Sequence, residues 1–341
     1  MDSKPVLSVI VPAYNVKSYI SQAVESALSQ SLADLEVIVV DDGSTDGTME
    51  TLRDIADPRL RRIHKTHAGL AAARNTAIGA SRGAFIGLLD GDDLWSKEKA
   101  KRHIRFLRSH PEIDLTFSCA LNIDESGLEI SPRSDKCGVL YFRDLLTRYP
   151  HCSAVFRREV IERAGLFDES LAGAEDLDLW LRIALQRYGS IYCIPDCLAS
   201  YRRRKNQLTA DLKREQEAWQ QLLHKFSRLA PDEICAFEKQ ANRMRYRYYS
   251  LLAYEQKEYH ESCRLLLKSL RHSLLNSLRE SETWSLAAAI TSGAILPDSF
   301  HQFLRRWTAV LRHRLHGNRR LNSQPSSAID CRPESGRNET A

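Results

Sequence analysis

The chain has 341 residues, 43% of them hydrophobic, and its 49 basic and 44 acidic side chains give a formal net charge of +5. The length favours two domains with ample apolar content for a core, and the charge balance excludes a chain-wide polyelectrolyte partner such as nucleic acid. Eight cysteines are scattered without a disulfide-framework spacing, which favours reduced thiols in a cytoplasm.

The chain begins with a strand–helix–strand pattern. Polar residues lead directly into a short β-branched run, residues 7–15, so no signal peptide is expected. Helical apolar spacing follows over residues 20–28, and a second strand signal over 35–40 stops at polar residues 41–44. A right-handed crossover puts both strand ends at one edge of a parallel sheet, where ligands of open α/β folds bind.

A later apolar run, residues 85–89, ends in three carboxylates, Asp90, Asp92 and Asp93, after an alanine-rich helical segment over 68–80. Hard oxygen ligands suit Mg²⁺ or Mn²⁺, which commonly bind one or two carboxylates together with substrate phosphates. The same pattern, alone, is also ordinary turn chemistry. Asp93 either supports a cation site indirectly or caps a helix that is predicted to begin near Ser96.

Five segments, in this order and spacing, resemble the family 2 glycosyltransferases. They are Val-Pro-Ala-Tyr-Asn (11–15), Val-Asp-Asp-Gly-Ser-Thr-Asp (40–46), Ala-Arg-Asn (73–75), Leu-Asp-Gly-Asp-Asp (89–93) and Gly-Ala-Glu-Asp-Leu-Asp-Leu-Trp-Leu (173–181). The resemblance covers residues 6–205 and implies an α/β GT-A fold, a Rossmann-like, mostly parallel sheet with flanking helices. It implies transfer, with inversion, of a sugar from a nucleotide diphosphate sugar, in the first place a UDP-sugar. The implied acceptor is a saccharide or a lipid-linked molecule in cell-surface polysaccharide or glycan biosynthesis.

The resemblance also implies which residues bind the donor. The implied nucleotide-sugar-binding residues are Pro12, Tyr14, Asn15, Asp41, Asp42, Arg74, Asp90 and Gly91. Tyr14 would lie beside the base, and Asp41 would hydrogen-bond it. Asp92, together with Asp90, would hold Mn²⁺ or Mg²⁺, which neutralises charge on the departing diphosphate. For Asp41 and Asp42, capping of a strand-to-loop turn is the alternative.

Glu175 and Asp176 open a predicted helix, where acidic residues are favoured by the helix dipole in any case. Direct displacement also needs a base that takes the proton of the acceptor hydroxyl. The resemblance implies that Asp176 is this base and that Glu175 orients the acceptor or the sugar. Trp180 lies on the apolar face of the same helix and is predicted to be core.

Several polar residues receive weaker interpretations. His151 is expected to be structural, with contact to the sugar or diphosphate as the alternative, and His64 and His67 are given no role. The basic run 202–205 is expected to be solvated, although it could meet phosphates or an anionic acceptor. Residues 193 and 197 are cysteines on either side of a proline, but no second pair at ligand spacing completes a zinc site.

The predicted domains are a GT-A catalytic domain over 1–205, an all-α extension over 206–316 and a disordered polar tail over 317–341. Within the extension, two helices are expected to join at 256–258. No apolar run reaches the roughly 20 residues that span a bilayer. A basic amphipathic helix over 300–315 either contacts an anionic membrane peripherally or packs on the protein. The expected location is therefore the cytoplasm, at the inner face of the cell membrane if that helix binds lipid.

Two other classes of protein remain open. One is a GT-A module that binds nucleotide-sugar without catalysis. The other is a glycoside hydrolase that uses paired carboxylates and needs neither nucleotide nor metal, against which the Asp-x-Asp at a strand end speaks.

Overall fold

The computed structural model describes residues 4–132, 136–147, 153–171, 173–204, 207–272 and 281–295. His151, the basic helix predicted at 300–315 and the predicted tail at 317–341 lie outside the described residues. The chain divides into two compact units, Met1–Ile290 and Thr291–Ala341, and all the elements below except the last residues of α11 belong to the first.

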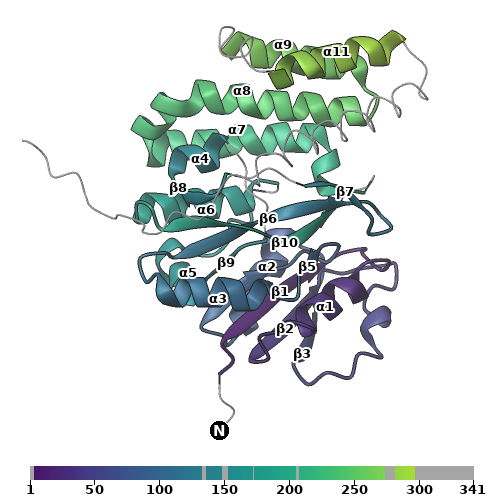
Figure 1. Cartoon of the computed structure of the whole chain (residues 1–341), viewed down its shortest axis with the longest axis vertical. Helices are drawn as coiled ribbons and strands as arrows, with labels where there is room; N and C mark the ends of the chain where they lie inside the picture. Colours follow the sequence, from purple (N-terminus) through teal and green to yellow (C-terminus); the bar gives the residue numbers. More distant parts are fainter. Residues whose placement is uncertain are drawn as a thin grey trace, which may run out of the picture. The chain divides into compact units, whose positions relative to one another are not determined.

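A ten-stranded mixed sheet lies at the centre of the first unit (Figure 1). Its main path runs in the order β3-β2-β1-β4-β9-β6-β10-β5, while β7 pairs with β6 and β8 pairs with β10. The strands are β1 Leu7–Ala13, β2 Leu35–Asp41, β3 Leu60–His64, β4 Phe85–Leu88, β5 Leu94–Trp95, β6 Leu115–Ile123, β7 Glu129–Pro132, β8 Gly138–Leu140, β9 Val155–Arg157 and β10 Ile191–Arg202.

Strand direction decides where the polar loops gather. β1 is parallel to β2 and β4, β2 to β3, and β6 to β10, whereas β9 runs antiparallel between β4 and β6. Two antiparallel pairings in succession return β6 to the direction of β4, so six strands end at the same edge of the sheet. The predicted Rossmann-like, mostly parallel sheet is confirmed.

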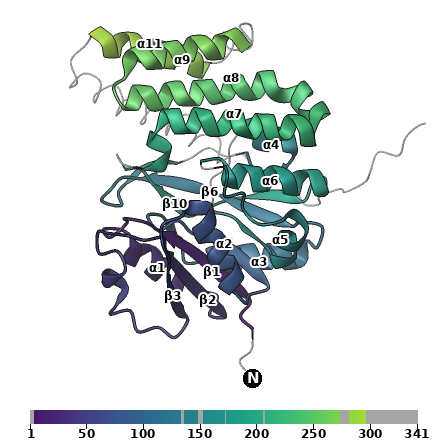
Figure 2. The ribbon, with the colours of Figure 1, turned by 180° about the vertical axis from the view of Figure 1, so that it is seen from behind.

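Helices cover both faces of the sheet, because its strands are apolar on both sides. Val9 and Val11 of β1 belong to one core cluster, which also contains buried residues of α1 (Ile20–Leu28) and α3 (Lys99–Ser109). Ile10 belongs to the opposite cluster. That second layer, seen from behind in Figure 2, contains α2 (Leu70–Ala80), α4 (Phe142–Thr147), α5 (Arg158–Ala164) and α6 (Glu175–Gln186). The side chain of Trp180 on α6 is fully buried, so its predicted core position is confirmed.

The C-terminal elements are helical. They are α7 (Leu212–Leu229), α8 (Pro231–Glu255), α9 (Tyr259–His272) and α11 (Ser281–Ile295), and the predicted join at 256–258 is confirmed. Trp219 and Phe226 of α7 share a core cluster with α4 and α6. Lys225 of α7 also pairs with Asp168 and Asp178, at 2.7 and 2.6 Å. The first helices of the extension therefore pack on the sheet domain, while the boundary at residue 205 stays a prediction. Among the helices described, none is both long and apolar enough to span a bilayer.

Candidate active site

Polar loops from four strands meet at the edge where the parallel strands end. Asn15 follows β1, Asp41 closes β2, Asp90 follows β4 and Arg202 closes β10. The topology makes these ends neighbours because β2, β1 and β4 are adjacent and β10 shares their direction. This edge is where ligands of open α/β sheets bind.

The loops after β1 and β2 interlock. Asn15 adopts the left-handed backbone conformation (φ 51°), and its amide donates to Ser44 Oγ at 3.0 Å. Its side-chain Oδ1 accepts from the amide of Thr45 at 2.9 Å. Beside it the ring of Tyr14 is 44% exposed and stacks on the imidazole of His67, with the ring centroids 4.2 Å apart. The result is a partly exposed aromatic surface at the sheet edge, suited to stacking with a base.

Asp41 and Asp42 are both buried and have different partners. The carboxylate of Asp41 accepts from the amide of Ser44 at 3.0 Å and lies 2.8 Å from His64 Nδ1. Asp42 accepts from Lys65 Nζ at 2.8 Å and from the amides that lead into α2, those of residues 68 and 69, at 3.0 and 2.7 Å. Burial raises the pKa of Asp42, but these hydrogen bonds outweigh it and hold the pKa below its ordinary value. Asp42 thus anchors the start of α2.

Gly91 is placed where a side chain would be crowded. A Cβ built there would lie 3.0 Å from the carbonyl oxygen of Pro12 and 3.2 Å from atoms of Val16 and Ile20. Pro12 itself lies in β1, opposite Val40 of β2. The close approach of these backbones brings the loop after β4 directly against the end of β1.

Two arginines at the end of β10 hold the carboxylates that follow β4. Arg204 Nε donates to Asp92 Oδ2 at 2.6 Å. The amide of Arg202 donates to Asp93 Oδ1 at 2.9 Å, and its Nε donates to the carbonyl of Asp92 at 2.8 Å. The guanidinium groups of Arg202 and Arg204 also lie over the ring of Tyr19, 4.9 and 5.7 Å from its centroid.

One expectation about this region is wrong, and one of the two alternatives for Asp93 is excluded. The basic run at 202–204 is not a solvated surface, because Arg202 is only 1% exposed and Arg204 pairs with Asp92. Asp93 does not cap a helix near residue 96. Residues 94–95 instead form β5, which pairs with β10, and α3 begins at Lys99 with Glu98 in the capping position.

The carboxylates after β4 fit a divalent cation. Burial raises the pKa of Asp92 to about 6, with the charges of Asp93 and Asp90 adding to the effect and Arg204 opposing it. Burial and the neighbouring carboxylates thus disfavour the negative charge on Asp92, which a bound cation would offset. Asp90 and Asp92 offer hard oxygen atoms, the ligand type that Mg²⁺ and Mn²⁺ prefer. The donor set therefore fits the predicted cofactor.

Arg74 links the Asp-rich loop to the start of α6. Its side chain is 1% exposed, and its two terminal nitrogens reach Asp90 Oδ1 at 2.8 Å and Glu175 Oε1 at 3.5 Å. Glu175 also accepts from the amide of Gly173 at 2.8 Å, and Asp176 accepts from the amide of Leu177 at 2.7 Å. Burial raises the pKa of Glu175, as does the charge of Asp176, while Arg74 lowers it.

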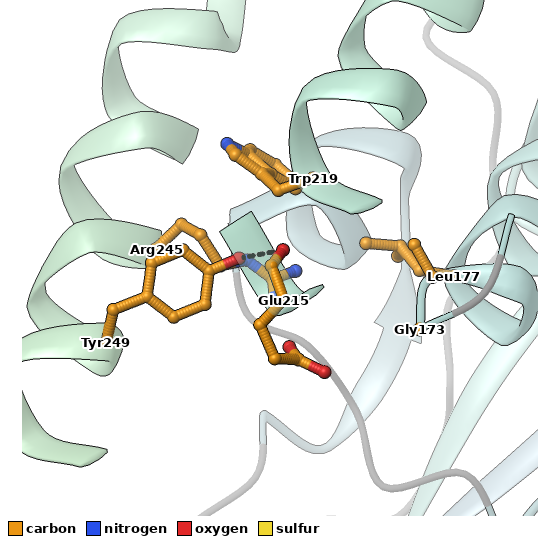
Figure 3. Close-up of a pocket in the computed structure, with 7 residues that line it drawn as sticks. Gly173, Leu177, Glu215, Trp219, Arg245 and Tyr249 are labelled. Carbon is orange, nitrogen blue, oxygen red and sulfur yellow. Dashed lines mark hydrogen bonds between the residues drawn. The ribbon is translucent and has the colours of Figure 1, made fainter. Parts of the chain in front are cut away.

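A third buried carboxylate faces the acidic pair from the helical extension. Figure 3 shows Glu215 of α7 in a small pocket lined by Gly173, Ala174, Leu177, Trp219, Arg245 and Tyr249. The hydroxyl of Tyr249 donates to the carbonyl of Glu215 at 2.7 Å. Burial raises the pKa of Glu215 to about 7; the charges of Asp176 and Glu175 add to this rise, and Arg245 opposes it. The extension thus contributes directly to the surroundings of the predicted base.

Sequence reasoning did not assign several of these residues. His64 and His67 were given no role, yet they contact Asp41, Asp42 and Tyr14. Their position at and just beyond the end of a third parallel strand was the signal available, because the ends of parallel strands share an edge. Nothing local marks Glu215, since it is one acidic residue in the first turn of an ordinary helix.

The sequence of this chain is similar to those of known proteins. A model described as glycosyl transferase family 2 matches residues 8–165. The glycosyltransferase TuaG of Bacillus subtilis, whose name places it provisionally in teichuronic acid biosynthesis, is 30% identical over 219 residues, which are 61% of this chain and 83% of TuaG. The chain belongs to glycosyl transferase family 2.

Two other relatives of this family 2 member are matched over a smaller share of their own length. EpsJ of Bacillus subtilis, an uncharacterized glycosyltransferase, is 34% identical over 220 residues, 60% of this chain and 63% of EpsJ. Chondroitin synthase of Escherichia coli is 34% identical over 184 residues, 53% of this chain and 26% of the synthase. The chain thus spans less than two thirds of either protein.

Solved structures match the fold over most of the chain. S. aureus TarS 1-349 in complex with UDP-GlcNAc has a TM-score of 0.58 at 22% identity, covering 88% of this chain and 92% of that one. The mannosyltransferase PcManGT from Pyrobaculum calidifontis, in complex with GDP-Man and Mn²⁺, has a TM-score of 0.55 at 21% identity, covering 86% and 87%. At these identities the likeness concerns the fold, and it confirms the predicted GT-A fold with a helical extension.

Proposed function

We propose that this family 2 protein transfers a sugar, with inversion, from a UDP-sugar to a saccharide or lipid-linked acceptor in the synthesis of a cell-surface polysaccharide or glycan. The observation that carries the proposal is the position of Arg74. This one buried guanidinium contacts both Asp90, at the donor edge, and Glu175, beside the candidate base. A donor site linked through one arginine to the neighbour of the candidate base supports both acting in one reaction, because catalysis needs the reacting groups held close together.

The donor would bind across the loops after β1, β2 and β4. Tyr14 and Asp41 would contact the base, Asn15 and Asp42 would hold the loops around it, and Gly91 would let the diphosphate approach the backbone. Asp90 and Asp92 would hold Mn²⁺ or Mg²⁺, which when bound supplies positive charge to the departing diphosphate. UDP is supported by the TarS complex, whereas PcManGT binds GDP-Man, so a binding test must include both nucleotides.

At the acceptor side, Asp176 would take the proton of the attacking hydroxyl. The hydrogen bond from the amide of Leu177 fixes its carboxylate at the start of α6. Glu175 would orient the acceptor or sugar while Arg74 holds it in place. Displacement in one step with a single base inverts the anomeric carbon.

Calorimetric titration of UDP, dTDP and GDP, with and without Mn²⁺, tests the donor site. We expect UDP to bind only with the metal, and we expect Asp92→Ala to abolish that binding. Asp176→Asn should keep the nucleotide affinity while UDP release from UDP-sugars, with a panel of saccharide acceptors, falls by at least about 100-fold. Asp196→Asn, an exposed change on β10, is the matched control.

The outcomes separate the candidate functions. Metal-dependent binding without turnover on any donor and acceptor would indicate a non-catalytic nucleotide-sugar-binding module. No nucleotide binding under any metal condition would overturn the transferase proposal and return attention to a glycoside hydrolase. Full turnover by Asp176→Asn would remove Asp176 as the base.

We also propose that the protein works in the cytoplasm, at the inner face of the cell membrane. The basic amphipathic sequence at residues 300–315 supports this proposal. Deleting residues 298–341 should release the protein from anionic liposomes without changing the melting temperature of the remainder. A much lower melting temperature would instead show that this sequence packs on the protein.

A further inference from the structure

Three cysteine sulfur atoms lie together in the second half of the sheet, away from the carboxylates at the strand ends. Cys119 belongs to β6, Cys193 to β10, and Cys137 directly precedes β8. Their sulfur atoms all lie within 4.8 Å of one another. The Sγ atoms of Cys119 and Cys137 are 3.5 Å apart.

The strand register explains this cluster. β6 and β10 are parallel, with Cys193 opposite Phe117, two residues before Cys119, and the register shifts after Ile194 so that Cys197 lies opposite Cys119. β8 is antiparallel to β10, with Gly138 opposite Cys193, which places residue 137 next to the same pair of strands. The three cysteines, at positions 119, 137 and 193, are far apart in the sequence. Their spacing therefore does not match a local metal-binding motif. The pair considered from sequence, 193 with 197, is not the one that the fold assembles.

The distances fit a tetrahedral metal ion. Zinc–sulfur bonds of about 2.3 Å place two sulfur ligands of a tetrahedron roughly 3.8 Å apart. The 3.5 Å separation of Cys119 and Cys137 is close to that value. A disulfide bond, at about 2.05 Å, would require those two sulfur atoms to move much closer together.

We propose that Cys119, Cys137 and Cys193 bind one Zn²⁺ ion. Thiolate ligands select soft or borderline metals such as zinc over Mn²⁺ and Mg²⁺, so this site is chemically distinct from Asp90 and Asp92. Each thiol releases its proton as its zinc–sulfur bond forms. Cys119 and Cys193 are buried, whereas Cys137 is exposed, so the group opens to solvent on the side of Cys137.

The role of the ion is structural. It ties the chain before β8 to two parallel strands, and β8 leads into α4, which packs against α6 in the same core cluster. The other bound strand, β10, continues to the arginines that hold the Asp-rich loop. Zinc binding therefore stabilises both elements that border the candidate active site.

Metal analysis of the full chain, purified under reducing conditions without added metal, tests the proposal. We expect one zinc per chain. Cobalt substitution should produce a thiolate-to-cobalt charge-transfer absorption, which carboxylate ligands do not give. Loss of a residue that only supports a metal ligand lowers metal affinity by about 10- to 100-fold. Cys137→Ser removes a ligand itself, so it should weaken zinc binding by at least about 100-fold. Cys137 is exposed, so this variant avoids a change in the core.

Two controls make the result specific. Cys263→Ser, at an exposed cysteine on α9, should leave the zinc content and the cobalt spectrum unchanged. Asp92→Ala should also leave them unchanged, which separates this site from the carboxylates. The proposal is overturned if reduced wild type binds no zinc or cobalt, or if Cys137→Ser keeps the wild-type zinc affinity.

Discussion

Replacing Glu215 by glutamine should stabilise the protein at alkaline pH. Glu215 is 8% exposed, and burial raises its pKa from 4.5 to about 7. In the folded chain, ionisation above that pKa adds a buried negative charge that the charges of Asp176 and Glu175 disfavour. Glutamine keeps the shape of the side chain and removes the charge.

The sign and the size follow from the two pKa values. Between pH 4.5 and about 7 the folded chain keeps a proton that the unfolded chain has lost, so stability falls as pH rises through this window and is then level. The difference, 7 − 4.5 = 2.5, corresponds to about 3 kcal/mol at most, at 1.36 kcal/mol for each unit. Glu215→Gln should therefore match wild type near pH 5 and exceed it above pH 7.

Thermal and urea unfolding of the full chain at pH 5, 6, 7 and 8 measures this difference. At pH 8 the variant should melt roughly 5 °C above wild type, since each kcal/mol shifts the melting temperature of a large domain by about 2 °C. Glu217→Gln is the control, because Glu217 lies on the same helix and its side chain is 62% exposed. This variant should have nearly the melting temperature of wild type at every pH. A Glu215→Gln variant less stable than wild type at pH 8 would show that Arg245 holds an ionised Glu215 favourably, and would refute the reasoning.

Three further substitutions test other parts of the structure. Gly91→Ala should lower stability by about 1–3 kcal/mol and weaken UDP binding, because the added Cβ meets the end of β1 at 3.0 Å; calorimetry and thermal unfolding measure both. Lys225→Met should cost about 2 kcal/mol in urea unfolding, because it removes a partner of the fully buried carboxylate of Asp178. His67→Ala should weaken UDP binding by roughly 3- to 10-fold in calorimetry, because Tyr14 loses the ring on which it stacks.

Each of these has a control. Gly79→Ala on α2 has open space around the added Cβ and should stabilise the helix by about 0.5–1 kcal/mol. Lys213→Met, at a side chain that is 88% exposed, should leave urea unfolding unchanged. Equal stability of Gly91→Ala and Gly79→Ala, or equal losses at Lys225 and Lys213, would contradict the packing and ion-pair arguments. Unchanged UDP affinity in His67→Ala would exclude the stacked rings from the donor site.

Local patterns in the sequence were enough to predict the order of the main elements. β-branched runs such as 7–11 and 35–40 specify strands buried on both faces, and apolar spacing at 20–28 and 249–267 specifies helices. The strand ends then follow from chain direction, so the carboxylates at 41 and 90 could be assigned to one edge in advance. Their roles in donor binding and catalysis stay predictions, because a role depends on a ligand.

Long-range contacts were decided only by the tertiary structure. The amide of Arg202 binds Asp93 across 109 positions of sequence, and Arg74 reaches Glu175 across 101. A run of arginines has the same local sequence pattern whether its side chains contact water or carboxylates. The sequence therefore indicated a solvated surface. Similarly, Glu215 owes its raised pKa to burial against the acidic pair. Local propensity acts over a few residues, whereas burial and charge pairing depend on which distant elements the folded chain brings together.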